Sequence, residues 1–306
     1  MQTFSVTDTA MVGFKFIGSR PGVVLVWGLA SVALALISTF TLTPAMLGPV
    51  QQMQALQGQG AGNPAAVVSA IGGMMGVFLL IFAISLIQYA VTFGATNRAI
   101  LRPEDSAFAY LRLGGDELRL LALNIALGLI GGVAFFVYLI VASLLVGLVA
   151  GALFVMLHAF ALIFAIPAWT VIICLPIFVL VRLSLAPAQT FATGRINLFG
   201  SWSLTRNHFW SMFGTYILMW ILAVLVIVLV FLIATIITMP LPGGGFQAMF
   251  PTNPGAGFSA ATLMSPARIV STLVIAFANA ALLPITLMPA PAIYRALTQG
   301  SVAETF

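Results

Sequence analysis

The sequence predicts an all-α polytopic membrane protein with six transmembrane helices in a single domain, residues 1–306. Hydrophobic residues make up 62% of the positions and charged residues only 6%, and the mean hydropathy is +1.18. A soluble domain has about a quarter of its residues charged. The apolar runs also lack the alternation of polar and apolar residues that membrane β-strands require. Helices are therefore the expected way to satisfy the backbone in lipid.

Six apolar runs are long enough to cross a bilayer, for which a helix needs about 20 residues. They cover residues 21–47, 67–95, 118–149, 153–185, 209–239 and 269–287. No charged residue lies between Arg119 and Arg182, which is too long a stretch for one span. Two spans joined by a tight turn near Gly147 and Gly151 fit this stretch, so we expect a helical hairpin.

The basic residues predict the orientation. Ten of the eleven lie before span 1, between spans 2 and 3, between spans 4 and 5, or after span 6, and only Arg268 lies in a connection on the other side. By the positive-inside rule both termini are expected in the cytoplasm. A cleaved signal peptide is the alternative for the N-terminal region. The first apolar run is longer than a signal peptide's, which favours a retained span.

The chain contains an internal repeat with a period close to 100 residues. The ends of spans 2, 4 and 6 read FGATNRAIL, FATGRINLF and PAIYRALTQ, and they place Arg98, Arg195 and Arg295 at corresponding positions. The repeats cover approximately 1–100, 101–194 and 195–306. Since each begins on the same side, we expect parallel repeats related by an axis along the membrane normal.

Each repeat begins with a segment that has helical periodicity. These segments read TDTAMVGFKFIGSRPG, EDSAFAYLRLGGDELR and GSWSLTRNHFW. In the third, Trp202 falls on an apolar side, and Ser201 and Thr205 fall on a polar side. We expect three short amphipathic helices at the cytoplasmic interface, where Arg206 and Trp210 suit the headgroup boundary. An ordinary solvated loop is the alternative.

Residues 182–214, RLSLAPAQTFATGRINLFGSWSLTRNHFWSMFG, carry a resemblance to a known family. Arg182 at the span end, the SLAP step, the SW and LT pairs and the FW pair resemble the membrane domain attached to some bacterial glycerophosphodiester phosphodiesterases, and the related YciC-like inner-membrane proteins. The resemblance implies a polytopic protein of the bacterial inner membrane. It does not imply phosphodiesterase activity, because that chemistry belongs to a separate soluble domain.

The side chains that catalysis or metal binding needs are scarce, and topology separates them. All six carboxylates lie outside the spans, and helix starts and solvation explain the pairs at 104–105 and 116–117. His158 falls in the outer half of span 4 and His208 at the inner start of span 5. Cys174 has no partner for a disulfide. We therefore expect no catalytic residue, no metal and no cofactor, and the net charge of +5 indicates orientation and lipid contact instead of nucleic acid.

Prolines and isolated polar residues within the spans are candidates for a cavity. Prolines interrupt the backbone hydrogen bonds of a span, and interrupted spans at matching places in a repeat can indicate a binding site. Packing of a helix bundle is the alternative explanation. The candidate residues are Gln88, Asn124, His158, Pro167, Pro176, Asn279 and Pro284.

Three functional hypotheses follow from these observations. The first is a non-enzymatic accessory or scaffold protein of the inner membrane, in contact with lipids, with another membrane protein or with a second copy of itself. The second is a permease or carrier for lipids or other uncharged hydrophobic compounds, through a cavity lined by spans 4 and 6. An intramembrane enzyme that uses His158 is the third.

Overall fold

A computed structural model of the chain describes residues 4–59, 64–157, 160–250, 261 and 264–299. Every regular element in these ranges is a helix, which confirms the all-α class. Six helices are long and apolar enough to cross a membrane, as a multi-pass protein requires. The candidate spans are Pro21–Leu42, Pro64–Leu101, Ala107–Val149, Ile172–Thr193, Phe209–Thr238 and Pro266–Thr298.

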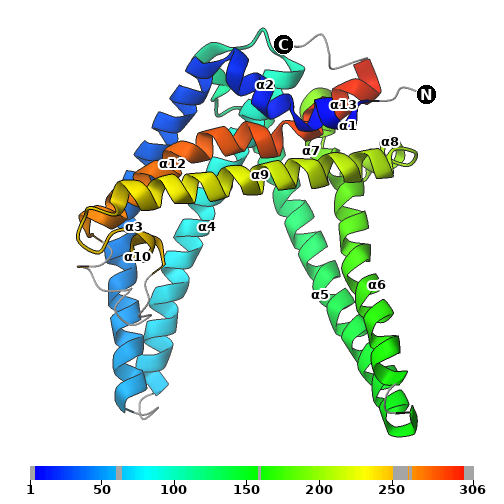
Figure 1. The fold of residues 1–306 in the computed structure, drawn as a ribbon, viewed down its shortest axis with the longest axis horizontal. Coiled ribbons are helices and arrows are strands. Elements are labelled where there is room, and N and C mark those ends of the chain that lie inside the picture. The colour runs from blue at the N-terminus through cyan, green and yellow to red at the C-terminus, as the bar shows by residue number, and fades with distance from the viewer. Residues whose placement is uncertain (1–3, 60–63, 158–159, 251–260, 262–263, 300–306) are drawn as a thin grey trace.

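Two long hairpins extend from one end of the molecule. The first joins α3 (Pro21–Gln59) to α4 (Pro64–Leu101), and the second joins α5 (Gly115–Leu157) to α6 (Phe160–Leu183). The hairpins contact each other near their upper ends and diverge below, so the molecule has the shape of an arch (Figure 1). Helix α3 continues through Pro44 and Pro49, so the outer connection expected after residue 47 is largely helical.

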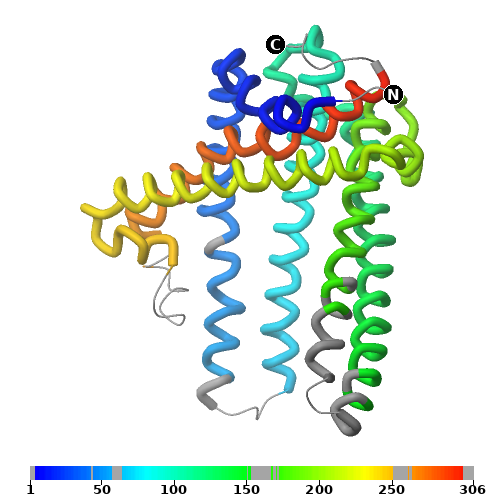
Figure 2. Tube along the Cα trace, turned by 45° about the vertical axis from the view of Figure 1, so that its right-hand side comes forward, coloured from blue at the N-terminus to red at the C-terminus, as the bar shows by residue number. Residues whose placement is uncertain are grey.

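Short helices gather where the hairpins meet, and we call this end of the molecule the cap (Figures 1 and 2). They precede the first long helix, connect the long helices or follow the last one. The cap thus brings together the segments that the basic residues predict to lie on one side. Its elements are α1 (Val6–Ala10), α2 (Val12–Ser19), η1 (Ala107–Tyr110), α7 (Ala186–Thr193), α8 (Gly200–Leu204) and α13 (Pro289–Gln299).

The third pair of long helices runs across the first hairpin. Helices α9 (Phe209–Thr238) and α12 (Pro266–Leu287) pack side by side, and α12 also packs on α3. In Figure 1 both lie transverse to the downward hairpins, with α10 (Phe246–Met249) near their far end. This orientation differs from the expected parallel arrangement of three hairpins, so the threefold repeat stays a prediction.

A close helix crossing holds α12 in this direction. A Cβ atom added at Gly13 of α2 would lie 2.5 Å from the backbone of Ile285, so α2 and α12 approach backbone to backbone. Pro284 is buried in α12 beside this contact. Pro284, which the sequence indicated as a candidate for a cavity, therefore lies in the tightly packed contact between α2 and α12.

The hydrophobic core lies in and just below the cap. The tightly packed cluster includes Phe16, Trp27 and Tyr110, and the rings of Phe16 and Trp27 stack 5.7 Å apart. By contrast, none of the residues in the most apolar window of the third candidate span is buried. The cap is therefore the packed part of the molecule, and the hairpins expose their apolar surfaces.

Candidate functional site: two buried arginines of the cap

Arg98 joins the two hairpins within the cap. It lies at the cap end of α4 with 3% of its surface exposed, and its Nη2 forms an ion pair with Oε1 of Glu117, which is also buried. Its Nη1 donates a hydrogen bond to the carbonyl oxygen of Tyr110, at 2.6 Å. Because Glu117 lies in the first turn of α5, the pair directly connects the first hairpin to the second.

The backbone around Glu117 is shaped to hold its carboxylate. The second carboxylate oxygen accepts a hydrogen bond from the Gly114 N–H at 2.9 Å, and the first turn of α5 favours a negative charge. On α4, a Cβ atom at Gly94 would lie 2.6 Å from Oε1 of Glu117. The absence of a side chain at Gly94 is what lets the carboxylate approach Arg98.

Further ion pairs surround this buried one. Asp105 pairs with Arg112 at 2.6 Å and lies 3.6 Å from Nε of Arg98, whereas Asp116 pairs with both Arg102 and Arg119. We call this set the Arg98 cluster: Arg98, Arg102, Asp105, Arg112, Asp116, Glu117 and Arg119. It contains four arginines and three carboxylates, so its charges nearly cancel.

A left-handed turn closes the cluster. Phe108, Ala109 and Tyr110 have φ angles of 52°, 54° and 65°, which costs on the order of 1–3 kcal/mol for each residue. Trp27 Nε1 donates to the carbonyl oxygen of Ala109 at 2.8 Å, and the Tyr110 hydroxyl donates to that of Pro103 at 3.0 Å. The sequence predicted an amphipathic helix here. The turn replaces it because side chains of α3 and α4 bind the carbonyl groups.

Arg182 occupies the corresponding place in the second hairpin. It lies at the cap end of α6 with 9% of its surface exposed, and its Nη1 donates to the carbonyl oxygen of Trp202 at 3.1 Å and to Oγ1 of Thr205 at 3.3 Å. In return, Ser201 Oγ donates to the Arg182 carbonyl oxygen at 3.0 Å. These bonds fix the short helix α8 against α6.

The surroundings of the Arg182 guanidinium are aromatic. Its central carbon lies 5.3 Å from the ring centre of Phe178 and 5.1 Å from that of Trp202, distances at which a cation interacts favourably with a ring face. Its Nε is enclosed without a hydrogen-bond partner. Among the described ion pairs, none involves Arg182. The site of Arg182, Phe178, Ser201, Trp202 and Thr205 is called the Arg182 site.

The arginines that the repeat placed at corresponding positions have different surroundings. Arg295 on α13 donates to the carbonyl oxygen of Ile100 at 3.0 Å, whereas Arg195 is exposed in the loop before α8. Arg182 therefore shares more with Arg98 than Arg195 does, because both are buried at the end of a hairpin and bind a carbonyl oxygen of the next linker.

The interfacial helix expected in residues 200–210 is short, and its polar side faces a different way from the expectation. Ser201 and Thr205 are buried against Arg182, whereas the amphipathic pattern places them toward water. Arg206 and Trp210 are exposed, and Trp210 keeps 78% of its surface accessible. The tryptophan and the arginine are thus exposed, as a position at the membrane boundary requires, while the polar pair binds Arg182.

The intramembrane polar residues do not converge. Gln88 lines a cavity of about 260 Å³ between α3, α4 and α12, whose other walls are largely apolar. Asn124 donates to the carbonyl oxygen of Leu120 at 2.8 Å within α5, and Asn279 is exposed on α12. Pro167 and Pro176 lie within α6. His158 lies outside the described residues.

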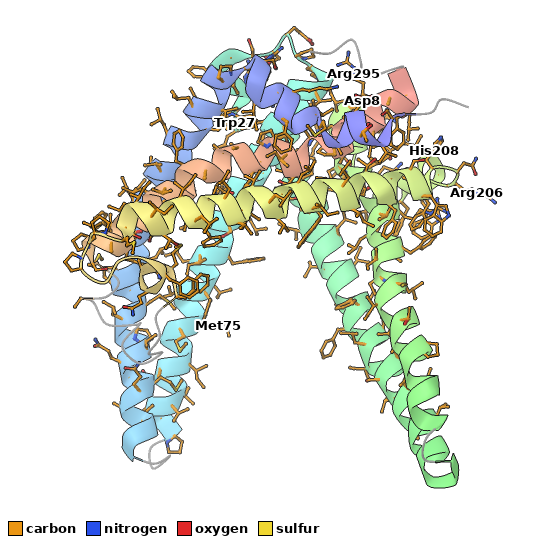
Figure 3. All side chains as sticks on the ribbon, viewed as in Figure 1. Asp8, Trp27, Met75, Arg206, His208 and Arg295 are labelled. Atoms are coloured by element: carbon orange, nitrogen blue, oxygen red, sulfur yellow. The ribbon has the colours of Figure 1, made fainter. Side chains whose placement is uncertain are left out.

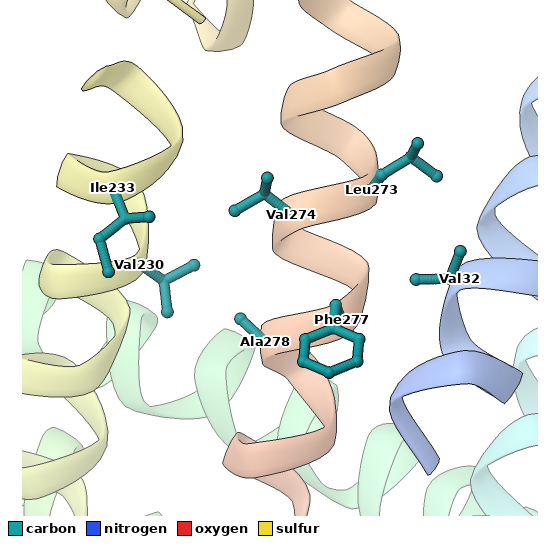
Figure 4. A pocket seen from close by; sticks show the side chains of 7 residues that line it. All are labelled: Val32, Val230, Ile233, Leu273, Val274, Phe277 and Ala278. Atoms are coloured by element: carbon teal, nitrogen blue, oxygen red, sulfur yellow. The ribbon is translucent and has the colours of Figure 1, made fainter. Parts of the chain in front are cut away.

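Two apolar cavities involve α12 but not α6. An apolar cavity of about 460 Å³ lies between α3, α9 and α12 (Figure 4), with walls formed by Val32, Val230, Ile233, Leu273, Val274, Phe277 and Ala278. Helices α6 and α12 do not pack against each other within the described ranges. The prolines of spans 4 and 6 therefore do not line one cavity there.

The part of the chain that the structure describes contains no group of three His, Cys, Asp or Glu side chains that could hold a metal ion. Comparisons of the chain with protein-family models, with curated proteins and with solved structures find no match. The geometry of the two arginine sites and the exposed hairpins are therefore the observations on which a function can be proposed.

Sequence reasoning missed Glu117, Gly94 and Tyr110 as parts of a site. Glu117 has the pattern of a helix-start carboxylate, and nothing in the local sequence distinguishes it from Asp116, which is less buried. Composition could have indicated the site. Of the six carboxylates in the chain, four form two pairs of sequence neighbours within 20 residues after Arg98.

Proposed function

We propose that the chain is a non-enzymatic scaffold or accessory protein of a bacterial inner membrane, with both termini in the cytoplasm. The observation that carries the proposal is how little its spans bury one another: 11%, 6% and 0% of the most apolar windows of the first three candidate spans are buried. Surfaces left open by the chain itself are available to lipids, to a partner membrane protein or to a second copy.

The diverging hairpins present these surfaces on two sides of the arch (Figure 1). Phe82 on α4 is 61% exposed and Phe136 on α5 is 66% exposed. A large contiguous apolar surface indicates contact with a membrane or another protein. The arch held by the cap therefore suits a protein that positions neighbours in the bilayer.

The orientation rests on the cap. Ten of the eleven basic residues belong to the segments that precede, connect or follow the hairpins on that side, and anionic lipids of the cytoplasmic leaflet attract such segments. The resemblance of 182–214 to the membrane domain of bacterial glycerophosphodiester phosphodiesterases supports the bacterial inner membrane, and we propose membership of that family.

Site-specific photo-crosslinking in native membranes tests the scaffold. A photoreactive phenylalanine replaces Phe82 or Phe136, and Phe191, which is 1% exposed, is the matched buried control. We expect adducts with lipid or with another polypeptide at the two exposed positions and none at Phe191. Crosslinks from Phe82 to α5, or from Phe136 to α4, within one chain would contradict the proposal, because they require the hairpins to close on each other below the cap.

Labelling with a membrane-impermeant thiol reagent tests the orientation, in a chain whose Cys174 is replaced by serine. Gln54→Cys and Phe246→Cys report on the outer ends of the first and third hairpins, and Arg195→Cys reports on the cap. We expect the first two to react in intact cells and the third only after permeabilisation. Protection of Phe246→Cys alone would reduce the six spans to four.

A carrier for lipids or other uncharged hydrophobic compounds is the second candidate. The observation in its favour is the apolar cavity between α3, α9 and α12, whose volume of about 460 Å³ lies in the range of small-molecule sites. Movement of a fluorescent lipid between the leaflets of vesicles that contain the protein would favour the carrier, and no movement is expected for the scaffold.

A further inference from the structure

We propose that the Arg182 site binds the phosphate group of an anionic phospholipid in the cytoplasmic leaflet. The inference deepens the proposed function and rests on it, because it requires the cap to lie at a lipid headgroup layer. The guanidinium of Arg182 is buried, and no described carboxylate forms an ion pair with it.

No carboxylate in the described part of the chain forms an ion pair with Arg182. No aspartate or glutamate occurs anywhere from residue 118 to residue 303, and the carboxylates in the described ion pairs bind Lys15 or members of the Arg98 cluster. A buried charge without an opposite charge is costly. An anion supplied by the surroundings is therefore the missing partner.

The geometry leaves donors for such an anion. Nη1 is used by the Trp202 carbonyl oxygen and Thr205, and Nε is enclosed without a partner. Nη2 makes no hydrogen bond among the described residues and is not enclosed. A guanidinium matches the oxygens of a phosphate in geometry and charge. An anion reaching Nη2 would satisfy the edge of Arg182 that the protein leaves open.

The surroundings place the site at the boundary between headgroups and acyl chains. Trp202 covers one face of the guanidinium and is 38% exposed, and Trp210, the second residue of α9, is 78% exposed. Tryptophan prefers the membrane interface. Arg206 directly follows Thr205 and is exposed at the end of the arch where α8 meets α9 (Figure 3). It supplies a second positive charge without an ion-pair partner among the described residues.

Lipid-dependent thermal unfolding of the full-length protein tests the site. A ligand that binds the folded state raises the unfolding temperature by mass action. We expect phosphatidylglycerol, added to the protein in a neutral detergent, to raise this temperature more than phosphatidylcholine does. In Arg182→Gln the difference between the two lipids is expected to disappear, whereas a purely structural role would lower the unfolding temperature in both lipids and preserve the difference.

Arg195→Gln is the matched control, because it removes one positive charge from an exposed position of the same linker. It should keep most of the phosphatidylglycerol effect. Should Arg182→Gln fail to fold, Arg182→Lys tests the site instead. This variant keeps the positive charge but loses the planar edge of hydrogen-bond donors. We expect its apparent affinity for phosphatidylglycerol to be roughly tenfold weaker. An affinity equal to that of the unchanged protein would overturn the proposal.

Inorganic phosphate distinguishes the two sources of the same anion. Phosphate without lipid should leave the unfolding temperature unchanged, and an increase equal to that from phosphatidylglycerol would overturn the lipid assignment. Equal effects of both lipids on the unchanged protein would also overturn the site and leave the scaffold untouched. Conversely, labelling of Arg195→Cys from outside the cell would overturn the orientation, even where the lipid difference is observed.

Discussion

Arg98 and Arg182 lie at equivalent ends of the two hairpins, and their surroundings differ in one respect. Both guanidinium groups are buried, and both donate to a carbonyl oxygen of the following linker. Arg98 faces Glu117 and Asp105, whereas Arg182 faces the rings of Phe178 and Trp202. The first arginine has its counter-charge inside the protein. In the proposed lipid site, the second takes its counter-charge from a phospholipid, so an arginine would serve as a structural link in one hairpin and as a membrane contact in the other.

The largest expected effect comes from breaking the internal pair. Glu117→Gln keeps the shape of the side chain and leaves the Arg98 charge buried without its main partner, which should lower the free energy of unfolding by about 3–5 kcal/mol. Arg112→Gln, in a partly exposed pair with Asp105, should lower it by only about 0–1 kcal/mol. Denaturant unfolding in detergent micelles measures both. Equal effects would mean that burial does not distinguish the two pairs.

A smaller effect is expected from crowding the same pair. The added methyl group in Gly94→Ala would lie 2.6 Å from the Glu117 carboxylate, and overpacking of this kind costs about 1–3 kcal/mol. Gly72→Ala is the control on the same helix, because nothing lies within 4 Å of the added atom. It should be neutral or stabilising by up to about 1 kcal/mol through helix propensity. The same denaturant unfolding measures both variants. Equal changes in the free energy of unfolding for Gly94→Ala and Gly72→Ala would contradict a close contact at Gly94.

The contrast between the two arginines becomes sharpest in Arg182→Gln without anionic lipid. The change removes hydrogen bonds to Trp202 and Thr205, but it also removes a buried charge that has no counter-charge. The two effects offset each other, so we expect the free energy of unfolding to change by less than about 1 kcal/mol, well below the effect at Glu117. A loss as large as that of Glu117→Gln in detergent alone would show that Arg182 has an internal counter-charge after all.

The smallest effect is expected in α1, at an ion pair in water. The hydrogen bond from Ser5 and the contact with Lys15 lower the pKa of Asp8 below its usual value of 3.8. A lowered carboxyl pKa stabilises the folded state above the unfolded pKa, and this contribution is lost as the pH falls through the folded pKa. Asp8→Asn should therefore lower the unfolding temperature slightly at pH 6, and the difference from the unchanged protein should shrink as the pH falls below 3.8. A difference that stays constant as the pH falls below 3.8 would exclude charge as its cause.

Much of the architecture follows from periodicity and length alone. Long charge-free runs predict helices, and the first two hairpins have the expected order, because few other structures satisfy a backbone in lipid. The grouping of the basic segments at one end also follows, since each hairpin returns the chain to its starting side. These features depend on composition along the chain and not on particular contacts.

The direction of the third hairpin and the roles of single polar residues could not be predicted in this way. The transverse packing of α12 depends on the contact of Gly13 with Ile285, between residues far apart in the sequence. Phe108 and Ala109 have no sequence signal for a left-handed turn, because distant side chains stabilise it by binding its carbonyl groups. Likewise, Ser201 and Thr205 read as a solvated face until Arg182 is placed beside them.

The lengths of the helices in the hairpins have a consequence for what lies beyond the far leaflet. Helix α5 has 43 residues and is therefore about 64 Å long, whereas the hydrocarbon layer is about 30 Å thick. Even a tilt of about 40°, the upper end of the usual range, leaves it spanning about 49 Å along the membrane normal. The charged residues of α5 lie at its cap end. The part of α5 that exceeds the thickness of the hydrocarbon layer is therefore its far tip, which carries no charged residue. With the cap end of α5 at the cytoplasmic headgroups, as proposed, this tip extends beyond the hydrocarbon layer on the far side, where an apolar helix needs a cover other than lipid tails.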